Sequence, residues 1–200
     1  MSALAWFAVI VVTVTSVGLL LARDWRWLII HLATQYFGML ILVLAHWPLG
    51  MASVKVVAGW MSAAILGMTR SSLLREDKAD KSNTLPRGRL FRLFAAAVVI
   101  MIVASVTPRV DAIMANAGFA VTSGSLLLIG MGLLHLGVSN HILRVTLGLM
   151  TILSGFEILY ATVEGSVLVA AMLAVINLGL AMVGSYLLIA SNAEEEVEPL

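Results

Sequence analysis

Long apolar runs separated by short polar breaks make up most of the chain as far as residue 190. A helix that crosses a membrane needs about 20 mostly apolar residues. The predicted spans are 3–22, 27–45, 50–69, 90–107, 121–138, 141–160 and 166–190. The pattern therefore predicts an all-α bundle of about seven transmembrane helices in a single domain, and no internal repeat is evident in it.

The polar breaks divide this domain. A long polar connector, 70–89, separates the first three spans in 1–69 from the last four in 90–190. Pro108 is expected to end the fourth span, because proline lacks the backbone N–H that a helix interior uses. The segment 191–200 is acidic and is expected to be a solvated, irregular tail.

Composition supports the membrane assignment and excludes several chemistries. The 200 residues are 61% hydrophobic and 12% charged, whereas soluble domains average about 45–50% apolar and about 25% charged residues. The absence of cysteine excludes disulfides, thiolate metal ligands and Cys-ligated iron–sulfur clusters. No Gly-rich phosphate loop or HExxH pattern occurs. We therefore expect no catalytic, cofactor-binding or metal-binding residue in this chain, and no nucleic-acid partner.

Basic residues predict the orientation of the bundle. All of the 12 Lys and Arg residues except Lys55 and Arg109 lie in or next to the first, third and fifth connectors. Because cytoplasmic loops carry the excess of Lys and Arg, the N-terminus is expected outside and the C-terminus in the cytoplasm, in the cell inner membrane. Arg87, Arg89 and Arg92 alternate with apolar residues, a pattern typical of an anchor for lipid headgroups.

Two charged residues lie inside predicted spans, and such charges are functional candidates because they are costly in a bilayer. Lys55 lies about one turn inside the third span, and Glu157 lies at a similar depth in the sixth. The matched depth allows Lys55 and Glu157 to pair, and such a pair suits a proton relay. Two simpler interpretations stay open: Lys55 extends to the interface, or Glu157 is protonated and inert.

Three further polar residues inside spans are relay candidates, namely Gln35, His135 and Asn177. Hydrogen bonding between helices is the default interpretation for Gln35 and Asn177. His31 and His135 both lie near the predicted cytoplasmic end, so a site in which these two histidines hold haem is an alternative hypothesis.

Small residues are common in the last three spans, and they let helix backbones approach closely in lipid. They are Gly130, Gly132, Gly148, Gly155, Gly179, Ala181, Gly184 and Ser185. Dense packing without a soluble head domain predicts a subunit that assembles with other membrane proteins and with lipids.

Several motifs resemble those of a known family. The segment 121–190 contains GLLHLGVSNHILRVTLGLM and VAAMLAVINLGLAMVGSYLL, and it resembles the three-span NuoK-type subunit of respiratory complex I. The whole chain is more similar to the hydrogenase-4 component E family. The shared features are Gln35, Lys55 followed by two valines, and His141-Ile142-Leu143-Arg144 with Gly148 and Ser154-Gly155.

This resemblance implies a non-catalytic membrane subunit of a complex I-like or membrane-bound hydrogenase-like redox complex. Such a subunit holds antiporter-like subunits together and contributes to proton translocation, while the electron carriers lie in other chains. The alternatives from the residues themselves are a stand-alone transporter or channel and a haem-binding electron-transfer subunit.

The chain departs from these families at their acidic positions. Met150 and Val175 align with the intramembrane glutamates of NuoK-type subunits, and Leu153 aligns with a glutamate of component E proteins. Glu157 follows Leu153 by four residues and Met150 by seven, offsets that return to roughly the same helix face. Glu157 is therefore expected to be either a displaced relay carboxylate or an unrelated residue.

Overall fold

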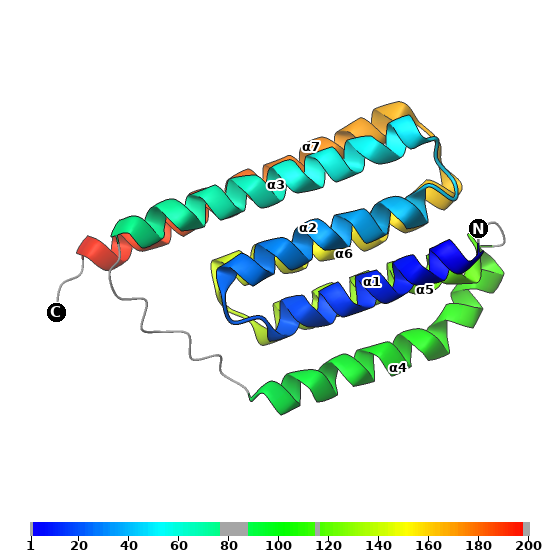
Figure 1. Cartoon of the computed structure of the whole chain (residues 1–200), viewed down its shortest axis with the longest axis horizontal. Helices are drawn as coiled ribbons and strands as arrows, with labels where there is room; N and C mark the ends of the chain where they lie inside the picture. Colours follow the sequence, from blue (N-terminus) through cyan, green and yellow to red (C-terminus); the bar gives the residue numbers. More distant parts are fainter. Residues whose placement is uncertain (1, 77–87, 115–116, 198–200) are drawn as a thin grey trace.

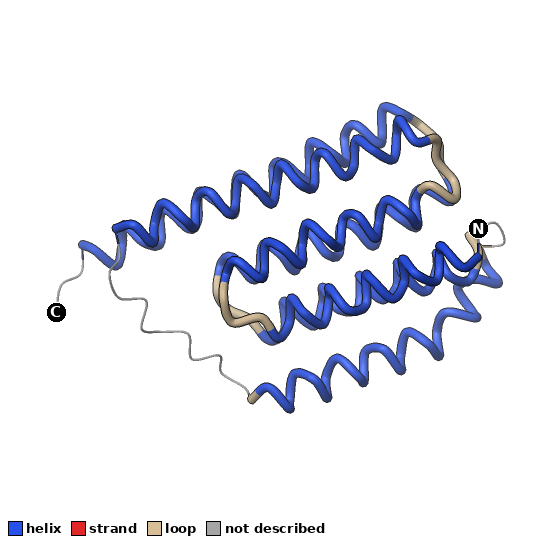
Figure 2. The backbone as a smooth tube through the Cα atoms, in the orientation of Figure 1, coloured by secondary structure: helices blue, strands red, loops and turns tan. Residues whose placement is uncertain are grey.

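A computed structural model describes residues 2–76, 88–114 and 117–197, and this part of the chain contains seven α-helices and no strand. The helices are α1 (Ser2–Leu21), α2 (Trp25–Val43), α3 (Leu49–Glu76), α4 (Arg89–Ile113), α5 (Phe119–Val138), α6 (Ile142–Val163) and α7 (Val167–Val197). Only short loops separate most of them (Figure 2). Each helix is long and apolar enough to cross a membrane, which confirms the predicted all-α class of multi-pass membrane protein.

The helices form two layers, with α4 along one edge (Figure 1). One layer contains α1, α2 and α3, and the other contains α5, α6 and α7. Between the layers, α1 packs on α5, α2 on α6 and α3 on α7. Because successive helices alternate in direction, each of these pairs is parallel. The two layers thus repeat one topology, although no repeat is evident in the sequence.

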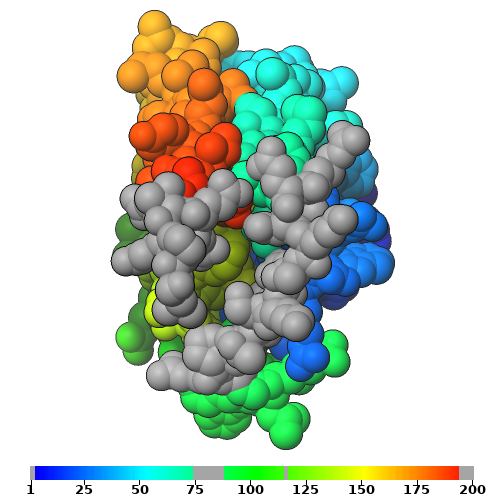
Figure 3. Space-filling view, turned by 90° about the vertical axis from the view of Figure 1, so that its left-hand side faces the viewer, coloured from blue at the N-terminus to red at the C-terminus, as the bar shows by residue number. Residues whose placement is uncertain are grey.

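The two ends of the bundle differ in charge. The α1–α2, α3–α4 and α5–α6 connections lie at the end where the chain finishes, and the N-terminus lies at the opposite end (Figure 1). We call the end where the chain finishes the arginine-rich end, after Arg23, Arg26, Arg70, Arg89, Arg92 and Arg144. Figure 3 looks onto it, with α3 and α7 adjacent at the top and α4 at the bottom. At the opposite end, Trp47 Nε1 donates a hydrogen bond to the Glu164 carbonyl at 2.9 Å and links two connectors.

The fourth helix does not end at Pro108, so that prediction was wrong. α4 continues to Ile113 with Pro108 inside it. The fixed φ of proline is compatible with a helix, and only one backbone hydrogen bond is lost. Transmembrane helices tolerate this loss when nearby side chains bond to backbone groups. One residue before the proline, Thr107 Oγ1 donates to the Val103 carbonyl at 2.7 Å, whereas the carbonyl that lacks its usual N–H donor is that of Ala104.

Two other helices extend into segments predicted to be connector or tail. α3 reaches Glu76, within the predicted connector 70–89, and residues 77–87 lie outside the described part of the chain. α7 reaches Val197, so most of the predicted tail 191–200 is helical, while Glu198 lies outside the described residues. Extending an existing helix needs no new nucleation, and Ala and Glu favour helix.

The helices α5 and α6 pack backbone against backbone through glycine. A Cβ atom on Gly155 would lie 2.7 Å from the Ser125 carbonyl oxygen, and one on Gly132 would lie 2.9 Å from the Gly148 carbonyl oxygen. Ser125 Oγ also donates to the Gly155 carbonyl at 2.6 Å. The expected close packing through small residues is therefore confirmed between α5 and α6. Of the seven spans, α6 is the most buried.

Candidate functional site

The buried helix α6 presents a row of polar side chains to the first layer. Arg144, Thr151, Ser154 and Glu157 are each at most 4% exposed. Successive members are seven, three and three residues apart, so each lies next to the following one while the row winds gradually around α6. At about 1.5 Å per residue the row is about 20 Å long, most of the ~30 Å thickness of a hydrocarbon core. Polar groups therefore extend through much of the bundle along α6.

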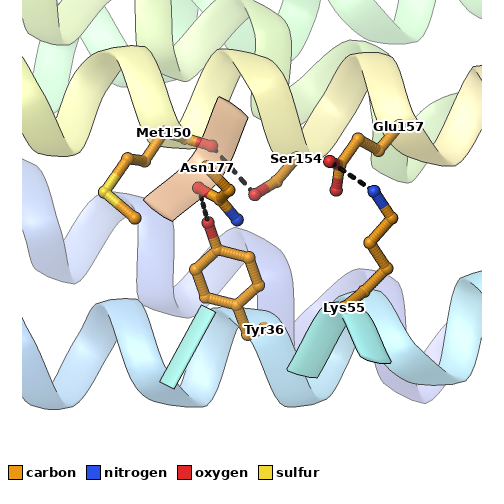
Figure 4. A network of polar contacts seen from close by, with 6 residues as sticks. All are labelled: Tyr36, Lys55, Met150, Ser154, Glu157 and Asn177. Atoms are coloured by element: carbon orange, nitrogen blue, oxygen red, sulfur yellow. Dashed lines mark hydrogen bonds and ion pairs between the residues drawn. The ribbon is translucent and has the colours of Figure 1, made fainter. Parts of the chain in front are cut away.

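Lys55 of α3 and Glu157 of α6 form an ion pair between the layers (Figure 4). Lys55 Nζ donates to Glu157 Oε1 at 2.7 Å, and both side chains are 1% exposed. Lys55 is buried and does not extend to the interface. Glu157 Oε2 is also buried, and no described group bonds to it. The structure thus brings together the two charges whose matched depth suggested a pair.

Tyr36 and Asn177 form the next contact along α6 (Figure 4). The Tyr36 hydroxyl donates to Asn177 Oδ1 at 2.8 Å. Ser154 lies beside this hydroxyl and donates its own proton to the Met150 carbonyl at 2.9 Å. Asn177 Nδ2 is buried without a partner among the described residues. Helices α2, α6 and α7 therefore meet at one polar point.

Gln35 continues this arrangement towards the arginine-rich end. Its Nε2 donates to Thr151 Oγ1 at 3.2 Å, and its Oε1 accepts from Ser16 Oγ at 3.4 Å. Gln35 is completely buried. We call the resulting series of side chains the polar axis, and it consists of Gln35, Thr151, Tyr36, Ser154, Asn177, Lys55 and Glu157.

His135 lies beyond the polar axis. It is 1% exposed and packs against Gly148, which lies between Arg144 and Thr151 along α6. Its charged neighbours are Arg144 and Arg92 at the arginine-rich end. Of the five relay candidates, the structure gathers Gln35, Lys55, Glu157 and Asn177 into the polar axis and leaves His135 with the arginines.

The placement of His31 gives the haem hypothesis no support. His31 is half-buried, and its Nδ1 lies 2.6 Å from the Trp27 carbonyl oxygen. It lines an open cavity of about 390 Å³ at the arginine-rich end, together with Gly18, Arg23 and Arg89. His135 is not among the residues that line this cavity.

The positions predicted to align with glutamates of the NuoK-type and component E families lie on different faces here. Met150 is completely buried and shares the inner face of α6 with Glu157 (Figure 4). Leu153 is half-buried, and Val175 of α7 is 68% exposed. Only Met150 therefore occupies a place from which a carboxylate would reach the polar axis.

Sequence reasoning missed three members of the polar axis. Thr151 and Ser154 precede Glu157 at intervals of three residues, and this spacing could have predicted a shared helix face. Tyr36 follows Gln35 directly, but nothing in the sequence indicated Asn177 as its partner. That contact depends on how α2 and α7 are placed around α6.

Comparisons of the chain with protein-family models, with curated proteins and with solved structures found no match. The class of protein is defined by the structure itself: it is a multi-pass helical membrane protein with a buried polar axis between two helical layers.

Proposed function

We propose that this chain is a membrane subunit that carries a proton relay and holds antiporter-like subunits in a complex I-like or membrane-bound hydrogenase-like assembly. The observation that carries the relay is the Lys55–Glu157 pair, with its 2.7 Å contact and 1% exposure on both sides. Apolar residues often replace a buried ion pair without loss of stability. Stability alone therefore does not explain the pair, whereas ionisable residues inside spans frequently serve as proton relays.

The polar axis has the chemical groups that a relay needs. The hydroxyls of Tyr36, Ser154 and Thr151 each donate and accept hydrogen bonds. Glu157 Oε2 and Asn177 Nδ2 are buried with no described partner, and such groups commonly bind an ordered water. A proton that arrives at Oε2 neutralises the carboxylate and weakens its attraction for the Lys55 ammonium. Proton arrival and departure at Glu157 thereby change the charge state of the pair.

The assembly role is supported by the resemblance of 121–190 to NuoK-type subunits and of the whole chain to hydrogenase-4 component E. The exterior of the bundle is apolar, as lipid or neighbouring spans require, with Met101, Leu168 and Val175 each at least 68% exposed. In this proposal the antiporter-like subunits and the electron carriers are other chains, and this subunit has no catalytic site of its own and binds no cofactor.

Glu157→Gln in the assembled complex tests the relay. We expect proton translocation into membrane vesicles, driven by the redox reaction of the complex, to fall at least about tenfold while the subunits still copurify, because an amide does not exchange protons as a carboxylate does. Glu164→Gln is the matched control, since Glu164 is an exposed carboxylate in the next connector. Unchanged translocation by an intact Glu157→Gln complex would refute the relay. If no redox protein and no antiporter-like protein copurifies with the tagged chain, the assembly role is refuted.

A stand-alone transporter is the second candidate, and the parallel topological repeat of the two layers favours it. Internal structural repeats occur in many transporter folds. The α1–α3 and α5–α7 layers have the same helix order and direction, with α4 outside them. This candidate predicts ion or solute flux in liposomes that contain only the purified chain. Absence of flux under a proton gradient and under solute gradients would refute it.

A further inference from the structure

Two arginines are buried at the arginine-rich end. Arg92 of α4 is 1% exposed and Arg144 of α6 is 4% exposed. Arg92 Nη1 donates to the Leu20 carbonyl at 3.0 Å, and Arg144 Nη2 donates to the Ala22 carbonyl at 2.5 Å. These carbonyls belong to the C-terminal end of α1, where helix carbonyls lack partners and the helix dipole is negative. One role of the two arginines is therefore to cap α1.

Capping uses only part of their hydrogen-bonding capacity. Arg92 Nε and Nη2, Arg144 Nη1 and His135 Nε2 are buried and have no partner within the described part of the chain. Neither Arg92 nor Arg144 forms an ion pair with a described carboxylate. A buried charged donor without a partner is unfavourable. Among the described residues, these particular donors therefore lack acceptors, and no ion pair neutralises either arginine.

Like charges also lie close together in this cluster. Arg92 experiences the charge of Arg23, and Arg144 experiences the charge of Arg92. Repulsion between such groups is stronger in a low-dielectric interior than in water. A bound anion would relieve this repulsion.

A small polar cavity lies at the same end, and Arg144 forms part of its wall. Its volume is about 60 Å³, and its polar lining consists of Arg23, Asp24, Arg70, His141 and Arg144. One water needs only about 10–15 Å³ of such space, so the cavity has room for a polyatomic anion.

We infer that this cavity binds a phosphate group, either as free phosphate or as the headgroup of an anionic phospholipid. The planar guanidinium matches the geometry of phosphate oxygens, and basic pockets between transmembrane helices bind anionic headgroups. Arg144 Nη1 supplies a hydrogen-bond donor that the helix cap leaves unused. The charge of Arg92 raises the positive potential behind it.

The binding experiment uses the purified full chain in detergent, with thermal unfolding and native mass spectrometry as readouts. The probes are phosphatidylglycerol, phosphatidylcholine and inorganic phosphate. We expect phosphatidylglycerol to bind and to raise the midpoint of unfolding above that in phosphatidylcholine. A shift with phosphatidylglycerol alone assigns a lipid headgroup, and an equal shift with inorganic phosphate assigns a free anion. No shift and no binding with either phosphate probe would overturn the inference.

Variants locate the site. Arg144→Gln is expected to weaken binding at least about tenfold, as loss of a charged hydrogen bond does. Arg109→Gln, at an exposed arginine at the opposite end of the bundle, is expected to bind normally. Arg70→Gln removes a second cavity arginine and leaves the α1 cap intact, so its weaker binding identifies the cavity even if Arg144→Gln does not fold. Binding by Arg70→Gln that equals binding by Arg109→Gln would contradict the assignment.

Discussion

The Lys55 ammonium and the Glu157 carboxylate show how a short contact between buried charges can be nearly neutral for stability. At 2.7 Å their attraction is strong, but taking each ion out of water costs several kcal/mol. The two effects largely offset each other. Removing one partner has a different result, because it leaves the remaining charge buried without compensation.

This asymmetry gives a prediction for a double-mutant cycle. Lys55→Met or Glu157→Leu alone is expected to lower the free energy of unfolding by about 3–5 kcal/mol. The double variant is expected to recover most of that loss, because both charges are gone and apolar side chains fill the space. Denaturant unfolding of the four proteins in detergent measures the cycle. A double variant whose loss equals the sum of the two single losses would contradict this account.

The lysine and glutamate were recognisable in the sequence because a charge inside an apolar run is conspicuous. Asn177 and Gln35 were recognisable for the same reason. Tyr36, Thr151 and Ser154 were not singled out, since tyrosine, threonine and serine are unremarkable in a span and a threonine or serine hydroxyl can bond its own helix backbone. Here Thr151 and Ser154 do so, and they also belong to the polar axis.

At the scale of the element, glycines determine which helices approach most closely. Gly155 has no room for a Cβ atom, because the Ser125 carbonyl would lie 2.7 Å away and a backbone atom cannot move without shifting α5. Gly179 of α7 has nothing within 4 Å of a Cβ position. The two glycines therefore have different roles, although both were counted among the small residues of the last spans.

The two positions form a matched pair of alanine substitutions. Gly155→Ala is expected to destabilise the bundle by about 1–3 kcal/mol, the usual range for overpacking. Gly179→Ala is expected to be neutral or stabilising by up to about 1 kcal/mol, since alanine favours helix over glycine. Thermal unfolding midpoints of the two variants in one detergent check this. Equal destabilisation by both would show that close packing of α5 on α6 is not the cause.

Helix ends were less predictable than helix positions. Pro108 resembled a terminator, yet α4 continues past it to Ile113. The acidic stretch after Ser191 resembled a tail, yet α7 continues to Val197. In both cases an established helix extends through a segment that the sequence suggested as its boundary, because elongation is far easier than nucleation.

At the scale of the whole molecule, an odd number of helices places the termini at opposite ends (Figure 1). Most of the described Lys and Arg residues belong to the arginine-rich end, where the chain finishes. The excess of Lys and Arg predicts that this end faces the cytoplasm. The polar axis then has a direction, with Gln35 nearer the cytoplasm and the Lys55–Glu157 pair nearer the outside.

Two single-cysteine variants test this orientation. The chain contains no cysteine, so an introduced thiol is unique. Gly88 and Gly165 are exposed glycines at opposite ends, and neither has an atom within 4 Å of its Cβ position. We expect a membrane-impermeant maleimide to label Gly165→Cys while this membrane is intact, provided that the reagent reaches its outer surface. Gly88→Cys is expected to be labelled only after the membrane is permeabilised. Labelling in the reverse order would invert the predicted orientation.

The sequence alone determined the class of protein, the number of helices and the depth of the buried charges. These properties follow from the length of each apolar run and from the cost of exposing backbone and charge to lipid, and both are local. The tertiary structure decided which faces meet. It joined Tyr36 to Asn177, separated His135 from the other relay candidates, and arranged two parallel layers. A helix that is apolar on all sides has no strong amphipathic face to indicate its neighbours, so packing between helices makes those choices.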